Sequence, residues 1–132
     1  MVLVDTSVFI SFFNGKNNSK TDLLKQLLLN CEDIAITGLI YQEVLQGIRT
    51  DKVFRELKGI LDDFYYINTP ESIYLESAQL FRKLQSNGVT IRKSIDITIA
   101  QSAINSKIPI LEHDRDFTNI AKHSNLKIFK NL

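Results

Sequence analysis

The chain has 132 residues, of which 44% are hydrophobic, so it is long enough for one domain with its own core and too apolar for a disordered protein. Its 16 basic and 15 acidic side chains leave a formal net charge of +1, which excludes a general electrostatic attraction to nucleic acid or membrane. Any phosphate-binding surface must therefore be local.

Cysteine content and the N-terminal sequence indicate the compartment. Cys31 is the only cysteine, so no internal disulfide can form, and we expect a buried thiol at a helix end. The N-terminus has no basic segment followed by a long apolar stretch, and no apolar run is long enough to cross a bilayer. We expect a cytoplasmic protein, folded as a single domain over residues 1–132.

The first half of the chain alternates short apolar runs with helical periodicity, which is typical of a parallel sheet covered by crossover helices. The apolar runs predict strands, and the leucines spaced along one helix face predict a helix that ends near Asn30. In chain order, the expected elements are a strand at 2–4, a helix over 23–28, a strand at 34–36, helices at 39–48 and 53–64, and a strand at 65–67.

The second half of the chain carries clearer helix-boundary signals. Residues 69–71 (TPE) predict a helix start, with a capping hydroxyl, a proline in the first turn and an acid favoured by the helix dipole. Asn87 and Gly88 predict its end in a left-handed turn. Ser94 is expected to cap the next helix. The remaining elements are that helix to about residue 105, a strand at 108–111, a short helix at 117–122 and a last strand at 127–129.

Four acidic residues lie where an inward-facing side chain is expected. Asp5 follows the first strand, Glu43 lies within a helix, Asp96 lies between two isoleucines, and Asp114 follows the fourth strand. Buried carboxylates are costly unless a positive charge meets them, and no basic residue has a spacing that would pair with all four. Two unit charges about 4 Å apart repel by roughly 4 kcal/mol at an effective dielectric near 20. We therefore expect a divalent cation, and oxygen-only ligands favour Mg²⁺ or Mn²⁺ over zinc.

Each acid also has a purely structural interpretation. Asp5 and Asp114 lie where Asp commonly caps a helix or forms a turn, which for either residue alone is the more frequent role. Asp96 falls in the first turn of its helix and would gain from the helix dipole. However, Asp96 shares its face with small residues such as Ala100, and Glu43 shares its face with apolar or small residues. These two acids are therefore expected to point inward.

Four sequence blocks, in this order and spacing, point to a family. They are residues 4–10 (VDTSVFI), the helix around Glu43, residues 94–100 (SIDITIA) and residues 111–117 (LEHDRDF). Together they resemble the PIN domain, most closely the VapC toxins of bacterial toxin–antitoxin pairs, over essentially the whole chain. The resemblance implies a single PIN domain with a three-layer α/β/α sandwich around a parallel sheet of about five strands.

The resemblance also implies an activity and a site. It implies a toxin that is a Mg²⁺- or Mn²⁺-dependent endoribonuclease, hydrolysing RNA phosphodiester bonds with an activated water. Asp5, Glu43, Asp96 and Asp114 match the family's acidic site, as catalytic residues and as metal ligands. Among accessory residues, Asp116 is either a further acid of the site or a helix cap. Thr6 and Ser7 match the family's hydroxyls beside the first acid.

The partners implied by the resemblance are an RNA substrate, a second copy in a homodimer, and a VapB-like antitoxin through which the complex could bind operator DNA. An acidic pocket ringed by apolar helix surface would accept a cationic side chain carried on an amphipathic segment. We therefore expect an antitoxin tail to insert an Arg or Lys among Asp5, Glu43 and Asp96. Its apolar residues would lie near Phe12, Phe13, Leu24 and Leu28.

One residue departs from the family pattern. Where the family usually carries Thr or Ser two residues before the fourth acid, this chain has Glu112. Glu112 either turns outward or adds negative charge that tightens metal binding and hampers the approach of RNA. The departure bears on catalytic efficiency more than on the fold.

Basic residues near the acidic blocks could steer the RNA backbone, although ordinary solvated surface charge explains each of them equally well. These candidate steering residues are Arg49, Lys52, Arg92, Lys93 and Arg115. Three rival functions have some support in the sequence. A phosphatase with an aspartyl nucleophile would need a second Asp at the position of Ser7. A zinc site would need more than His113 and His123. A catalytically weak or inert PIN domain could serve only as an antitoxin partner.

Overall fold

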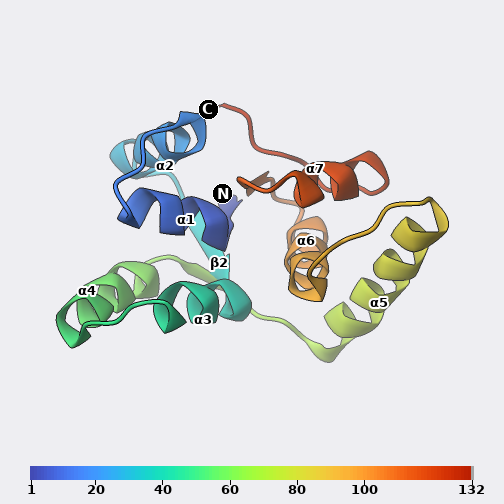
Figure 1. Ribbon diagram of the computed structural model, residues 1–132, viewed down its shortest axis with the longest axis horizontal. Coiled ribbons are helices and arrows are strands. Elements are labelled where there is room, and N and C mark those ends of the chain that lie inside the picture. The colour runs from blue at the N-terminus through green and yellow to red at the C-terminus, as the bar shows by residue number, and fades with distance from the viewer. Residues whose placement is uncertain (132) are drawn as a thin grey trace.

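The computed structural model describes residues 1–131. The strands lie between α1–α4, on the left of Figure 1, and α5–α7, on the right. The α/β sandwich predicted from the sequence is confirmed. In chain order, the elements are β1 (Val2–Val4), α1 (Thr6–Phe13), α2 (Ser19–Leu29), β2 (Ile34–Thr37), α3 (Gly38–Gln46), α4 (Asp51–Asp62), β3 (Tyr65–Ile67), α5 (Glu71–Ser86), α6 (Ser94–Ser106), β4 (Ile110–Leu111) and α7 (Arg115–Lys122).

The sheet is parallel and has the strand order β3-β2-β1-β4. β1 is central, with Leu3 paired to Ala35 on one side and to Ile110 on the other. The strand expected at residues 127–129 reduces to a single bridge between Ile110 and Ile128, so the sheet has four strands within the described residues. Because all strands run in one direction, their carboxyl ends lie at one edge, and Asp5 and Glu112 follow two of them directly.

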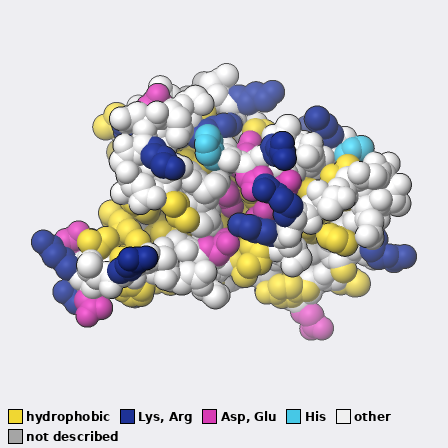
Figure 2. Space-filling view, in the orientation of Figure 1, with side chains coloured by type: hydrophobic (Ala, Val, Ile, Leu, Met, Phe, Trp, Pro, Cys, Tyr) yellow, Lys and Arg dark blue, Asp and Glu magenta, His cyan; other side chains and the backbone are white. Residues whose placement is uncertain are grey.

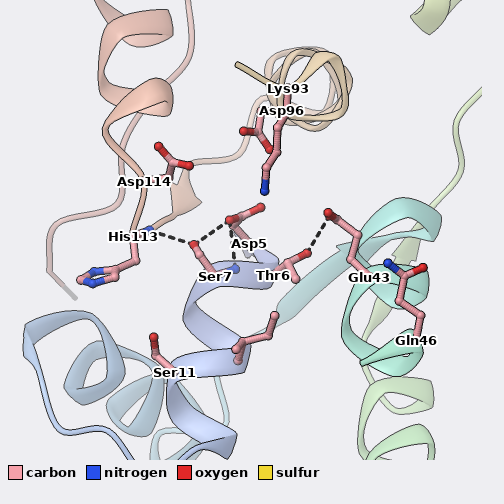
Figure 3. A pocket seen from close by; sticks show the side chains of 11 residues that line it. Asp5, Thr6, Ser7, Ser11, Glu43, Gln46, Lys93, Asp96, His113 and Asp114 are labelled. Atoms are coloured by element: carbon pink, nitrogen blue, oxygen red, sulfur yellow. Dashed lines mark hydrogen bonds between the residues drawn. The ribbon is translucent and has the colours of Figure 1, made fainter. Parts of the chain in front are cut away.

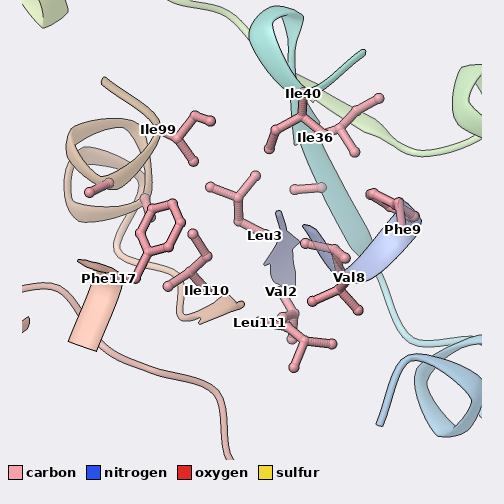
Figure 4. Packing of buried hydrophobic residues seen from close by; sticks show 14 of the residues in the cluster. Val2, Leu3, Val8, Phe9, Ile36, Ile40, Ile99, Ile110, Leu111 and Phe117 are labelled. Carbon is pink, nitrogen blue, oxygen red and sulfur yellow. The ribbon is translucent and has the colours of Figure 1, made fainter. Parts of the chain in front are cut away.

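The core lies on both faces of β1 and its neighbours. Figure 4 shows Leu3 and Ile110 facing Ile99 of α6 and Phe117 of α7, with Val8 of α1 on the opposite side of Leu3 from Phe117. All five side chains are fully buried. Burial of this kind contributes roughly 1.5–3 kcal/mol for each large apolar side chain, so the core holds the strand ends and helix starts in fixed positions.

Helix boundaries agree with the sequence only in part. Gly88 has φ +75° and ends α5 in the expected left-handed turn. Thr69 and Ser94 were predicted as caps, and both predictions were wrong. α5 begins after Pro70 and α6 begins after Lys93, and neither helix has a side-chain cap bond. α1, which begins directly after Asp5, was not among the elements expected from the sequence.

Cys31 is exposed, so the prediction of a buried thiol was wrong. It has φ +53° and lies one residue beyond Asn30, which ends α2, so the chain has already turned away from the core. No helix within residues 1–131 combines the length and the apolar character needed to span a bilayer.

Candidate active site

An open cavity of about 420 Å³ lies at the carboxyl-terminal edge of the sheet. Asp5, Glu43, Asp96 and Asp114 all line it, and they come from the start of α1, from α3, from α6 and from the β4–α7 loop. Figure 3 shows the four carboxylates around one space, with the side chain of Lys93 reaching into it. The fold thus brings together four acids that are up to 109 residues apart, from position 5 to position 114.

Asp5 is held by the first turn of α1. It is the N-cap, and its Oδ2 accepts hydrogen bonds from the Ser7 backbone N–H at 3.1 Å and from the Ser7 hydroxyl at 2.7 Å. The Ser7 hydroxyl in turn accepts the backbone N–H of His113 at 3.2 Å, which ties α1 to the β4–α7 loop. Burial raises the pKa of Asp5, the bonds from Ser7 oppose this effect, and Glu43 raises the pKa further.

Glu43 and Asp96 face the cavity from opposite helices. The Thr6 hydroxyl donates to Glu43 Oε1 at 3.0 Å, and Glu43 is half-buried. Asp96 is buried in the first turn of α6. Burial raises the pKa of Asp96 to about 7, helped by the charges of Asp5, Asp114 and Glu43, while Lys93 acts in the opposite direction. Asp96 therefore lies in the first turn of its helix and also lines the cavity, so both interpretations of this residue hold.

Asp114 and Asp116 share a basic partner that spacing in the sequence did not indicate. Arg92 donates from Nη2 to Asp114 Oδ1 at 3.0 Å and from Nε to Asp116 Oδ2 at 3.2 Å. Asp114 also caps α7 by accepting the backbone N–H of Asp116 at 2.9 Å. Carboxylate oxygens of Asp96, Asp114 and Asp116 lie within 4.8 Å of one another. Asp114 can therefore cap α7 and belong to the acidic site at the same time.

Glu112 follows neither of the two expected orientations. It is buried and does not line the cavity. Its Oε2 accepts the backbone N–H of Asp114 at 2.6 Å, and its Oε1 lies 3.8 Å from Lys20 Nζ. A Thr or Ser hydroxyl can accept the same type of i+2 backbone bond. Glu112 therefore shapes the loop that carries Asp114, and its charge is directed toward α2.

The candidate steering residues fall into two groups. Lys93 lines the cavity and Arg92 is bound to the acids, whereas Arg49, Lys52 and Arg115 are exposed. Figure 2 shows acidic side chains gathered near the middle of one face, with basic side chains close around them. A contact of any of these residues with RNA stays a prediction.

A comparison with known families agrees with this geometry. The model of the PIN domain matches residues 2–123, which is most of the chain. The chain belongs to the PIN-domain family. The resemblance seen in the four sequence blocks is thereby confirmed, and the four-stranded sheet with its helical layers is a PIN fold.

Curated relatives of this PIN domain are ribonucleases by name. VapC ribonuclease Mb1587 from Mycobacterium bovis and Ribonuclease VapC11 from Mycobacterium tuberculosis are each 28% identical over 129 residues, covering 96% of this chain and 96% of the relative. Among solved structures, VapBC2 from Rickettsia felis bound to a promoter DNA fragment has a TM-score of 0.76 at 19% identity, covering 98% of both chains. FitAcB from Neisseria gonorrhoeae has a TM-score of 0.74 at 19% identity, covering 98% of this chain and 96% of the other. At these identities the structures support the fold alone.

The donor set of the PIN-domain cavity fits a hard divalent cation. Every acidic ligand candidate offers carboxylate oxygen, which suits Mg²⁺ or Mn²⁺. Within residues 1–131, no basic side chain lies within 4.0 Å of the Asp5 or Asp96 carboxylates, so their charges are not compensated by an ion pair. Burial raises the pKa of Asp96 first, and the charges of Asp5, Asp114 and Glu43 raise it further. A bound cation would offset the repulsion among these acids.

The structure also bears on the rival sites. In the described part of the chain, the group of potential ligands that comes together contains three Asp residues and no His. Ser7 donates to Asp5, as a hydroxyl that orients a carboxylate. Gln46 lines the cavity and was missed, although it lies three residues after Glu43 and so on the same helix face.

Proposed function

We propose that this protein is the toxin of a VapC-type toxin–antitoxin pair and acts as an endoribonuclease that requires Mg²⁺ or Mn²⁺. In this proposal it works in the cytoplasm as a homodimer, hydrolyses RNA phosphodiester bonds, and is held inactive by a VapB-like antitoxin. The toxin–antitoxin complex would bind operator DNA through the antitoxin.

One observation carries the proposal. Four carboxylates, from Asp5, Glu43, Asp96 and Asp114, line one open cavity at the carboxyl edge of the sheet of a PIN domain. Relatives that match nearly the full length are named ribonucleases, which supports RNA as the substrate. Helix capping accounts for Asp5 and Asp114 singly, but it does not account for four carboxylates that converge on one cavity, and this convergence favours a functional role.

The residues of the chain would divide the work. Asp5 and Asp96 would hold the cation, with Glu43 and Asp114 bound directly or through water. Ser7 and Thr6 would keep Asp5 and Glu43 in position, since their hydroxyls already donate to these carboxylates. When bound, a divalent cation supplies Lewis acidity toward the phosphate and charge for the transition state. Lys93, at the cavity wall, would attract the RNA backbone.

We expect the antitoxin to bind this protein beside the acidic cavity. A small apolar groove of about 150 Å³ lies between α1 and α3, lined by Ile10, Phe13, Val44 and Ile48. Ile10 lines both this groove and the acidic cavity. Leu24, expected to contact the tail, is only 1% exposed and belongs to the core, so that part of the prediction was wrong. An amphipathic segment lying in the groove would bring a basic side chain to Asp5 and Glu43.

Cleavage of RNA by the purified protein tests the proposal. The wild-type chain should cut RNA when Mn²⁺ or Mg²⁺ is present and stop when a chelator is added, and Asp96→Asn should abolish cleavage while keeping the fold. Glu56→Gln is the matched control, because Glu56 is an exposed acid on α4 outside the cavity. Full activity of Asp96→Asn would contradict the proposal.

A further inference from the structure

Arg92 holds two acids of the site at once. Its guanidinium reaches Asp114 Oδ1 at 3.0 Å through Nη2 and Asp116 Oδ2 at 3.2 Å through Nε. Asp114 is half-buried and Asp116 is buried, whereas 62% of the Arg92 side chain is exposed. The positive charge therefore reaches these carboxylates from the solvent side, as an added cation would.

A guanidinium and a divalent cation compete for the same two carboxylate groups, those of Asp114 and Asp116. Asp114 Oδ1 already accepts two N–H groups, one from Arg92 and one from the Asp116 backbone. A carboxylate oxygen has two lone pairs, so this atom has no free acceptor site while Arg92 remains in place. Two positive charges on neighbouring oxygens would also repel each other.

Arg92 can leave without disturbing the fold. The Arg92 side chain is 62% exposed, so its guanidinium is solvated when it leaves, and the buried Asp116 carboxylate then takes the cation as its new partner. Ile91, directly before it, is buried and keeps the segment in position whether or not the guanidinium is bound. Asp114 and Asp116 would keep their backbone bond as well.

We propose that Arg92 is an internal counter-ion, which occupies Asp114 and Asp116 in the cation-free chain and competes with a divalent cation for the Asp96–Asp114–Asp116 end of the site. This inference rests on the proposed metal-dependent function and adds a regulatory contact to it. Cation binding at this end then requires that the Arg92 head move away. The affinity of the chain for Mn²⁺ is accordingly lower than its carboxylates alone would give.

Binding of Mn²⁺ without RNA tests this inference, measured by calorimetry or by the electron paramagnetic resonance signal of free Mn²⁺. Arg92→Gln removes the charge and the fork, and it should tighten Mn²⁺ binding by about tenfold, within the usual range of coupling between two linked sites. Arg115→Gln is the matched control. It removes an equal charge from the residue between the two acids, and within residues 1–131 the Arg115 side chain makes no ion pair. It should change the affinity by less than about twofold at physiological salt.

The direction of the change separates competition from scaffolding. If Arg92 instead held the acids in place for the ion, Arg92→Gln would weaken Mn²⁺ binding, and that result would overturn the inference. Equal affinities for Arg92→Gln and Arg115→Gln would overturn it as well. In the Asp116→Asn background, the gain from Arg92→Gln should become smaller, because one of the two contested carboxylates is gone.

Failure of the inference can be told apart from failure of the proposed function. If neither the wild-type chain nor Arg92→Gln binds Mn²⁺, that result contradicts both the metal site and the competition between Arg92 and the cation. If Mn²⁺ binds and Arg92→Gln tightens it, but no RNA is cut, only the proposed activity fails. Arg92→Lys, which keeps the charge and loses the fork, should fall between the wild-type chain and Arg92→Gln.

Discussion

The acidic site has two regions, and different partners hold their carboxylates. In the first region, Asp5 and Glu43 receive hydrogen bonds from the neutral groups of Ser7 and Thr6. In the second region, Asp114 and Asp116 receive a guanidinium from Arg92. A hydroxyl orients a carboxylate without cancelling its charge, whereas a guanidinium does both.

Asp96 lies between these regions and shows what the difference means. Its pKa is raised to about 7 by burial first and then by the charges of Asp5 and Asp114, one from each region. The first region has oriented oxygens and no bound positive charge, which makes it the stronger attraction for a cation. The second region starts with its charge already compensated.

The largest expected effect distinguishes the two regions by RNA cleavage. Asp5→Asn should lower the cleavage rate by about 10²–10³-fold, the usual loss when one group that stabilises transition-state charge is removed. Asp116→Asn should lower it by roughly tenfold or less, because Arg92 already neutralises Asp116. Rates would be compared at the same Mn²⁺ concentration. Equal losses in the two variants would remove the distinction.

Thermal unfolding should show the next largest effect. Mn²⁺ at one hundred times its dissociation constant should stabilise the wild-type chain by about 2.7 kcal/mol, and a chelator should reverse this. At the same Mn²⁺ concentration, Asp5→Asn should lose more of this stabilisation than Asp116→Asn. Calorimetry or circular dichroism gives the melting temperatures. Indifference of the melting temperature to both ion and chelator would argue against a preformed site.

The pH dependence of stability tests the charge between the two regions. Because the folded pKa of Asp96 is raised from 3.8 to about 7, the folded chain binds more protons than the unfolded chain within this window. The metal-free free energy of unfolding should therefore fall as pH rises from about 4 to 7, by at most about 1.4 kcal/mol per pH unit from this group. Asp96→Asn should flatten that slope. Denaturant unfolding at several pH values measures it.

The last expected effect concerns the loop that carries Asp114. Glu112→Ala should destabilise the chain by about 1–3 kcal/mol, because the Asp114 backbone N–H loses its acceptor. Glu112→Thr should cost less, since a hydroxyl can accept from the residue two positions later. Denaturant unfolding compares the two variants. If Glu112→Thr and Glu112→Ala are equally unstable, the hydrogen bond contributes little.

Prediction from sequence worked best where neighbouring residues decide the outcome. The apolar runs at 2–4 and 34–36 became strands, the run at 108–111 became a strand over its last two residues, and Gly88 ended α5 as its left-handed backbone requires. Prediction failed for Thr69 and Ser94 as caps. Those assignments placed the helix start at the nearest hydroxyl, whereas the observed starts follow Pro70 and Lys93 without a side-chain cap.

The sequence by itself determined the features that are set locally: the buried strands, most of the helices, the parallel sheet, and four acids at positions expected to face inward. Only the tertiary structure decided which charges meet, since Arg92 finds Asp114 across 22 positions and Glu112 turns toward Lys20 across 92. The physical reason is that hydrophobic periodicity depends on residues a few positions apart, whereas ion pairs depend on which segments the packed core brings together.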